Sequence, residues 1–241
     1  MTDFEKSKLL SQFPEIKHGT YVYSPRFIID GKLTADRDQL FKKLGLKEDD
    51  SLFMGILKHT DNVFVIKEKT GNGLLTKIPE TDSLITNQKS VYLISYTADC
   101  LPIFIFDPIK KVVAMVHAGW KGVLNKIALK TITEMEDEFG SKREDVLVYI
   151  GPAIGPCCYD DKTPEKFEMF KKYKNATEKR DGKYFIDIKS AAKQDLLEFG
   201  ILPDHLEISE ICTGCRDNTF ASHHIEGAER TASNLSVIAL V

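Results

Sequence analysis

Three short apolar runs lie close together in the middle of the chain and predict its central strands. They cover residues 91–96, 101–106 and 111–116, and each is rich in β-branched or aromatic side chains. Their apolar character is nearly continuous rather than alternating, which is typical of strands buried on both faces. Further strands are predicted at residues 52–57, 63–67, 146–150, 206–211 and 235–240.

Helical periodicity follows the third central run. Apolar residues recur at helical spacing from Val123 to Phe139, and Gly140 ends the pattern. A second helix is predicted at residues 188–199, before Gly200, a third starts at Thr163-Pro164-Glu165, and a fourth covers residues 34–44. The stretch 171–183, rich in Lys and Glu, is expected to be a loop that ends in an Asp-Gly turn.

The order of these elements predicts an α/β fold, a layered and mostly buried mixed β-sheet with flanking helices. The chain has 241 residues without a repeat or a linker rich in Pro, Gly and Ser, so we expect one domain over residues 1–241. Well-mixed charges and a net charge of −3 leave no basic field for nucleic acid or anionic lipid. Neither kind of partner is therefore expected.

The first fifteen residues lack the apolar stretch of a signal peptide, and no segment is long enough to span a bilayer. A cytoplasmic, reducing location is therefore the expectation. In such a compartment the five cysteines are expected to be buried thiols, metal ligands or nucleophiles rather than disulfides.

Cys100 and His117 are the first candidates for chemistry. Cys100 opens the second central run and His117 ends the third. Ends of central strands are where open α/β sheets present functional groups, so both side chains are expected at one rim. A thiolate and an imidazole within reach of each other form a metal site or a nucleophilic Cys–His pair. A buried small cysteine and a hydrogen-bonded core histidine fit the spacing equally well.

The turn after His117 adds a possible anion contact. Gly119 and Gly122 flank Trp120-Lys121 directly before a predicted helix. Glycines allow close backbone approach, a helix start offers free N–H groups to an anion, and Lys121 adds a positive charge. A tight strand-to-helix turn without any ligand explains the two glycines nearly as well.

Other histidines and cysteines carry weaker signals. His59 lies in a polar turn, where a histidine is usually only solvated. Cys212 and Cys215 have CxxC spacing, but without a second Cys or His pair this is a weak zinc signal. The vicinal Cys157-Cys158 are interpreted as packing residues in a rigid loop. Adjacent histidines at 223 and 224 would point to opposite sides of a strand, so at most one would face a given site.

Three ordered motifs resemble one family. They read, in order, Thr97-Ala98-Asp99-Cys100-Leu101-Pro102, His117-Ala118-Gly119-Trp120-Lys121-Gly122 and Gly151-Pro152-Ala153-Ile154-Gly155-Pro156-Cys157-Cys158-Tyr159. Together these motifs are similar to the signature of the YfiH family. Its members are called laccase-domain or multicopper polyphenol oxidoreductase proteins and include FAMIN-like purine nucleoside phosphorylases. The likeness extends from about Leu57 to the end of the chain. Residues 21–32 depart from the family pattern, and His223 and His224 stand where it has arginines.

The resemblance implies that His59 joins Cys100 and His117 as a zinc ligand. It also implies phosphorolysis of adenosine, inosine and methylthioadenosine, with adenosine deaminase activity, and a fold related to cysteine-dependent deamidating toxins. Purine nucleosides and phosphate would be the partners. Three protein ligands and an open fourth position are the catalytic pattern of zinc. Asp99 is then the candidate proton carrier, and Lys121 and Arg230 are candidate anion contacts.

Two other functions stay open at this point. Cys100 and His117 would form a metal-free hydrolase acting on an amide if His59 were dispensable. A non-catalytic zinc protein would bind the metal and turn over nothing. A blue-copper polyphenol oxidase is disfavoured, because its centres need on the order of ten imidazole ligands and the chain has six histidines.

Overall fold

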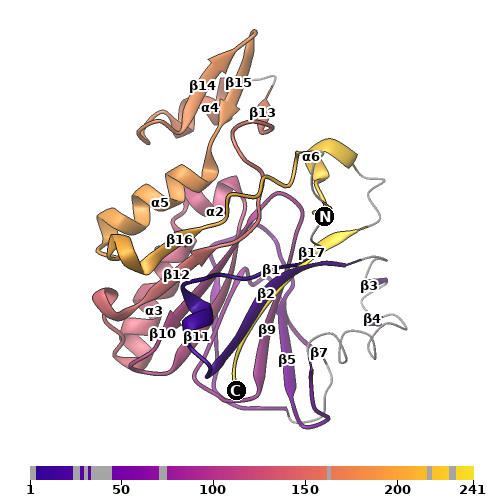
Figure 1. Cartoon of the computed structure of the whole chain (residues 1–241), viewed down its shortest axis with the longest axis vertical. Coiled ribbons are helices and arrows are strands. Elements are labelled where there is room, and N and C mark those ends of the chain that lie inside the picture. The colour runs from indigo at the N-terminus through magenta and orange to yellow at the C-terminus, as the bar shows by residue number, and fades with distance from the viewer. Residues whose placement is uncertain are drawn as a thin grey trace.

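Two six-stranded mixed sheets form the body of the protein in the computed structural model (Figure 1). The structure describes residues 4–23, 28–29, 32–33, 45–70, 75–161, 164–215, 219–227 and 232–241. The helix predicted at 34–44 lies outside these residues. The predicted α/β class with layered mixed sheets and flanking helices is confirmed, although the strands are divided between two sheets rather than forming one.

The first sheet is antiparallel on one side and parallel on the other. Its strand order is β1 (Phe4–Glu5), β2 (Ile16–Tyr23), β17 (Ser233–Leu240), β9 (Val91–Thr97), β5 (Ser51–Gly55) and β7 (Leu75–Ile78). β17 pairs antiparallel with both β2 and β9, whereas β5 is parallel to β9 and β7. The last long strand of the chain therefore lies in the interior of this sheet.

The second sheet carries the other two central runs. Its order is β16 (Leu206–Ile208), β12 (Leu147–Ile150), β10 (Leu101–Asp107), β11 (Val112–Ala118), β8 (Ser83–Thr86) and β6 (Val63–Ile66). The middle strands pair antiparallel and the two edge strands pair parallel. Every residue of β10 and β11 is buried, which confirms the expectation of strands covered on both faces.

Alternating side chains of the second sheet enter two different cores. Phe104, Phe106 and Met115 pack against residues of the first sheet such as Phe53 and Leu93. The opposite face packs against helices α3 (Ile127–Phe139) and α5 (Ile188–Phe199). The molecule is therefore layered as helices, second sheet and first sheet.

The helical segment after β11 is interrupted. α2 (Trp120–Leu124) ends at Asn125, and Lys126 adopts a left-handed φ of 59° before α3 begins. The single helix predicted from residue 123 to 139 is therefore wrong. The Lys126 ammonium lies 3.1 Å from the Asp195 carboxylate of α5, so the break directs this side chain toward the neighbouring helix. α3 and α5 end at the predicted glycines, both in left-handed conformations.

A small three-stranded sheet extends beyond the two large ones. It consists of β13 (Asp160–Asp161), β15 (Lys183–Ile186) and β14 (Thr177–Arg180), with α4 (Pro164–Phe170) beside it. The loop predicted over 171–183 is confirmed for residues 171–176 but wrong from residue 177 on, where β14 and β15 form a hairpin whose strands combine charged residues with half-buried positions. The predicted Asp181-Gly182 turn is confirmed, with φ values of 47° and 76°.

The remaining elements are short. His223 and His224 begin α6 (His223–Glu226), which is capped by the Ser222 hydroxyl, so the expectation that they lie on a strand is wrong. Among the described residues no helix is long and apolar enough to cross a membrane. The other elements are β3 (Ile28–Ile29), β4 (Lys32–Leu33), η1 (Leu10–Gln12), η2 (Arg143–Asp145) and η3 (Pro203–His205).

Candidate metal centre

His59, Cys100 and His117 come together at one rim of the second sheet. One ligand atom of each lies within 4.8 Å of the ligand atoms of the other two. The Cys100 sulfur is 3.8 Å from Nε2 of His59, and the two imidazole rings are 5.0 Å apart between centroids, at an angle of 73°. Two ring nitrogens and one sulfur are thus placed as a metal ion would need them.

The antiparallel pairing of β10 with β11 explains two of these positions. Leu101 pairs with Ala118 and Pro102 pairs with His117, so Cys100 stands beside the end of the neighbouring strand. His59 arrives from the segment that joins β5 of the first sheet to β6 of the second, and its φ is 57°. This left-handed residue turns the segment over the ends of β10 and β11.

Asp82 holds both histidine segments in place. Its carboxylate accepts a hydrogen bond from Nδ1 of His117 at 2.8 Å and from the backbone N–H groups of His59 and Thr60 at 3.1 and 2.8 Å. The bond to Nδ1 leaves Nε2 of His117 for Cys100 or a metal. Asp82 carries no motif in the sequence and stands there only at the start of a short apolar run, so it was not among the predicted site residues.

Hydrogen bonds rather than burial decide the charge states at this centre. Burial alone would raise the pKa of the Cys100 thiol, but hydrogen bonds from His117 and His59 lower it to about 7. Burial would likewise lower the pKa of His117, but Asp82 and Cys100 raise it to about 9. Against its burial, His117 and Thr60 hold the pKa of Asp82 well below its usual range. The centre therefore favours a thiolate, the form that binds metal or attacks carbon.

Gly119 provides the space in which the ligands meet. A Cβ added at this position would lie 2.8 Å from Cδ2 of His59 and 3.1 Å from the Cys100 sulfur. Its φ of −71° is one that any residue adopts, so the requirement is for room and not for backbone freedom. The close backbone approach predicted for Gly119 is therefore an approach to the side chains of His59 and Cys100.

Two cavities meet at Cys100. One of 330 Å³ contains His59 and His117 in its lining, and the other of 240 Å³ contains Asp99. Cys100 and His223 line both cavities. His224 lines the second cavity together with His223, so the expectation that at most one of these histidines faces a given site is wrong. The second cavity also exposes two aromatic residues, Trp120 and Tyr159, and one ammonium group, that of Lys166. Lys166 carried no sequence signal, since lysines are frequent in that charged stretch.

The predicted polar residues have distinct surroundings. Asp99 is buried with a φ of 91°, and its carboxylate accepts hydrogen bonds from the Thr213 hydroxyl at 2.7 Å and the His224 backbone N–H at 2.6 Å. Lys121 is exposed, with its ammonium 5.5 Å from the ring of Trp120. Arg230 lies outside the described residues. The structure thus places Asp99 in the lining of the 240 Å³ cavity, next to Cys100, and Lys121 beside Trp120 of the same lining.

The chain matches the family model described as "Multi-copper polyphenol oxidoreductase laccase" over residues 30–241. The chain belongs to this family. It is 33% identical over 175 residues to the protein named purine nucleoside phosphorylase LACC1 from Mus musculus, covering 70% of this chain and 39% of that protein. It is 35% identical over 167 residues to purine nucleoside phosphorylase YlmD from Geobacillus stearothermophilus, covering 66% and 61%.

The fold of this laccase-domain chain also occurs in a solved relative. The crystal structure of YfiH from Bacillus licheniformis superposes with a TM-score of 0.84 at 23% identity, covering 96% of this chain and 94% of that one. The resemblance seen in the three sequence motifs is therefore confirmed. The matched region spans less than two thirds of the length of the LACC1 and YlmD relatives.

Proposed function

We propose that this chain is a zinc-dependent purine nucleoside phosphorylase that acts on adenosine, inosine and methylthioadenosine and also deaminates adenosine. The observation that carries the proposal is the group of His59, Cys100 and His117, whose ligand atoms lie within 4.8 Å where two cavities meet. Relatives named purine nucleoside phosphorylase, at 33% and 35% identity, support the reaction class.

The donor set fits zinc. Two imidazoles and one thiolate are the borderline-soft ligands that zinc accepts, and a carboxylate on the far nitrogen of a ligand histidine is its usual second partner. Asp82 supplies that carboxylate to His117. A multicopper oxidase would need on the order of ten histidines, and the chain has six.

Zinc bound by three protein ligands acts as a Lewis acid and activates an oxygen nucleophile at neutral pH. Side chains that line the 240 Å³ cavity are proposed to bind the purine and the phosphate. Trp120 and Tyr159 offer aromatic faces to a purine ring. Lys166 lines the same cavity with its ammonium 2.8 Å from the Asp161 carboxylate, and it is proposed to exchange that partner for phosphate. Lys121 and Arg230 are proposed as further anion contacts.

Phosphorolysis joins a phosphate oxygen to C1′ of the ribose while the bond from C1′ to N9 of the purine breaks, and the leaving purine takes up a proton. Asp99 is the proposed proton carrier, because it lines the same cavity as Trp120 and Lys166. Its hydrogen bond to the His224 backbone also gives it a positioning role for α6. Deamination replaces the amino group at C6 with oxygen from water and releases ammonia.

Incubation with adenosine, with and without phosphate, tests the proposal. Chromatography that separates adenine from inosine reports the two reactions individually. We expect adenine only when phosphate is present and inosine when it is absent; with phosphate, part of the inosine is further converted to hypoxanthine. His59→Ala and Cys100→Ala are each expected to lower bound zinc and both products, because each removes one of three ligands.

A matched histidine control is available in His205, which lies in η3 and lines neither cavity. His205→Ala should retain zinc and turnover. If His59→Ala and Cys100→Ala both keep wild-type zinc content and turnover, the proposal is wrong. Bound zinc with no turnover of any nucleoside would instead identify a non-catalytic zinc protein.

One observation favours a second candidate, a metal-free cysteine hydrolase acting on an amide. The Cys100 sulfur, the His117 ring and the Asp82 carboxylate form the chain of nucleophile, base and orienting acid that such enzymes use. This candidate predicts amide hydrolysis that survives strong chelators, full activity of His59→Ala, and selective alkylation of Cys100. Loss of activity in His59→Ala would exclude it.

A further inference from the structure

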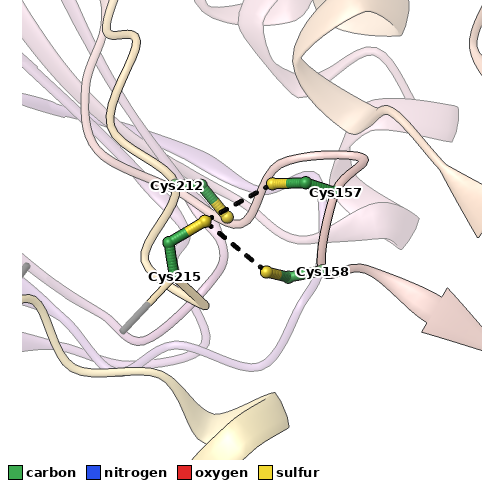
Figure 2. A group of neighbouring side chains, drawn as sticks. All are labelled: Cys157, Cys158, Cys212 and Cys215. Carbon is green, nitrogen blue, oxygen red and sulfur yellow. Dashed lines mark hydrogen bonds between the residues drawn. The ribbon is translucent and has the colours of Figure 1, made fainter. Parts of the chain in front are cut away.

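The other four cysteines of the chain form a second group, well separated from Cys100 in sequence. Cys157 and Cys158 lie in the loop between β12 and β13, and Cys212 and Cys215 follow β16 (Figure 2). All four sulfur atoms lie within 4.8 Å of one another. The weak CxxC signal at 212–215 thus acquires in the structure the second pair that it lacks in sequence.

The distances between the sulfurs are those of a shared metal ion. The Cys215 sulfur is 3.6 Å from that of Cys157 and 3.7 Å from that of Cys158. A disulfide would need about 2.05 Å. Four sulfurs at the vertices of a tetrahedron around zinc, each about 2.3 Å from the metal, are about 3.8 Å apart. The observed spacing agrees with the tetrahedral arrangement and is too long for a bond.

The surrounding backbone is shaped to let the two segments meet. A Cβ added at Gly214 would lie 2.7 Å from Cβ of Cys158, and one at Gly155 would lie 3.3 Å from Cβ of Cys212. Both glycines therefore face a cysteine of the opposite segment. Replacing either glycine with a larger residue would push the Cys157-Cys158 segment away from the Cys212-Cys215 segment.

A hydrogen-bond donor and a buried cation accompany the cysteine group. The backbone N–H of Gly155 donates to the Cys212 sulfur at 3.1 Å. The Lys189 ammonium, in a residue only 8% exposed, donates to the carbonyls of Ser209 and Ile211 at 3.0 and 2.7 Å. A zinc ion with four thiolates carries two net negative charges, so donors and a cation of this kind favour it.

We propose that Cys157, Cys158, Cys212 and Cys215 bind a second zinc ion, in a structural site of four thiolates. A closed set of four protein ligands is the pattern of structural zinc, in contrast to the three ligands of the His59 centre. Each thiol that coordinates the ion releases its proton, and no electrons are transferred. The ion would link a loop and a segment that are more than fifty residues apart in sequence.

This link stabilises the wall of the candidate active site. The loop that carries Cys157 and Cys158 also supplies Ile154 and Tyr159 to the 240 Å³ cavity. Ile154 donates its N–H to the carbonyl of Asp99 at 3.0 Å, and the Thr213 hydroxyl donates to the Asp99 carboxylate. Both segments of the cysteine site therefore donate a hydrogen bond to Asp99, the residue that precedes Cys100.

The test begins from the double variant His59→Ala/Cys100→Ala, which removes the proposed catalytic metal. Protein produced with zinc is measured by elemental analysis and by X-ray absorption at the zinc edge. We expect two zinc ions per wild-type chain and one per double-variant chain, the latter with only sulfur neighbours at about 2.3 Å. The result is independent of whether nucleosides are substrates.

Adding Cys212→Ser and Cys215→Ser to the double variant should abolish the remaining zinc. Native mass spectrometry of the wild-type chain avoids any folding defect of these variants, since it counts bound zinc directly and detects a disulfide as a loss of two hydrogens. No zinc in the double variant, nitrogen neighbours in its absorption spectrum, or a disulfide among these four cysteines in the wild-type chain would each overturn the proposal.

Discussion

One carboxylate fixes the positions of two candidate ligands. Asp82 binds the ring of His117 and the backbone N–H of His59, so the positions of both candidate ligands depend on this one carboxylate. Its side chain is fully buried. Shared support of this kind makes the two ligands interdependent, and substitutions there are expected to be non-additive.

Asp82→Asn is expected to weaken zinc binding about 10–100-fold, the usual effect of losing a carboxylate partner of a ligand histidine. The amide of Asn has one acceptor oxygen and would place an N–H₂ group against a backbone N–H. Zinc affinity is measured by competition with a chromophoric chelator. Asp107→Asn provides a control, since Asp107 also accepts backbone N–H groups but at a distant turn. Equal affinities for both variants and wild type would contradict this role of Asp82.

Gly119→Ala is expected to lower zinc content and turnover while leaving the fold intact. The added methyl group would lie 2.8 Å from the His59 ring, so that ring must leave its position. Gly122→Ala is the matched control, because its Cβ meets nothing closer than 3.4 Å. Circular dichroism and elemental analysis of both variants decide the question. Wild-type zinc content in Gly119→Ala would show that the ligands do not meet there.

At the scale of elements, sequence patterns located strands better than they assigned them to sheets. The runs that became β9, β10 and β11 are continuous and apolar, and their burial followed directly from that pattern. Which sheet each strand joins depends on long-range pairing, such as that of β9 with β17, and no local pattern encodes it. The break between α2 and α3 was missed for a similar reason, since Asn125-Lys126 is compatible with a continuous helix.

The same distinction between local and long-range information applies to the residues of the candidate site. Cys100 and His117 could be found because each lies at the end of a recognisable strand, and His59 could be found only through the family motifs. Asp82 and Lys166 could not be found, because their importance comes from where the fold places them. The cysteine group shows this most clearly, since two weak local signals combine only when β12 and β16 become neighbours.

The Asp181-Gly182 turn provides a test at the scale of the hairpin. Gly182 has a φ of 76° and no atom within 4 Å of an added Cβ, so Gly182→Ala acts through the backbone alone. We expect a loss of about 1 kcal/mol in the free energy of unfolding, the usual cost of a left-handed L-residue. Asp181→Asn is the control and should change stability by less than about 0.5 kcal/mol, because Asn tolerates this conformation. Denaturant unfolding measures both. An unfolding free energy of Gly182→Ala equal to that of the wild type would contradict the left-handed conformation of this turn.

At the scale of the whole molecule, one buried histidine lies in the contact between the two large sheets. His18 of β2 is 6% exposed, and its ring lies edge-on to that of Phe104 from the second sheet, with centroids 6.3 Å apart. Burial lowers the pKa of His18 below its ordinary value of 6.5. The neutral ring is therefore the form that the packed sheets accept.

The sign of the pH dependence follows from that shift. A depressed pKa means that the stabilisation from His18 is present above pH 6.5 and is lost as the pH falls through the lower value of the folded state. His18→Leu should remove this component, so the difference in unfolding free energy between wild type and variant should shift in favour of the variant below pH 6.5. Thermal or denaturant unfolding from pH 7.5 to pH 5 measures it. A difference that is constant over this range would show that His18 titrates normally.

The place of β17 has a consequence for synthesis of the chain. Within the described residues, β1 and β2 are joined to the rest of their sheet only through β17, which pairs with β2 on one side and β9 on the other. The ribosome releases β17 about two hundred residues after β2. Until then the edges of β2 and β9 stay open to wrong partners, a state that favours aggregation. Nascent chains arrested before residue 233 should therefore bind chaperones strongly, although the candidate metal ligands have already emerged.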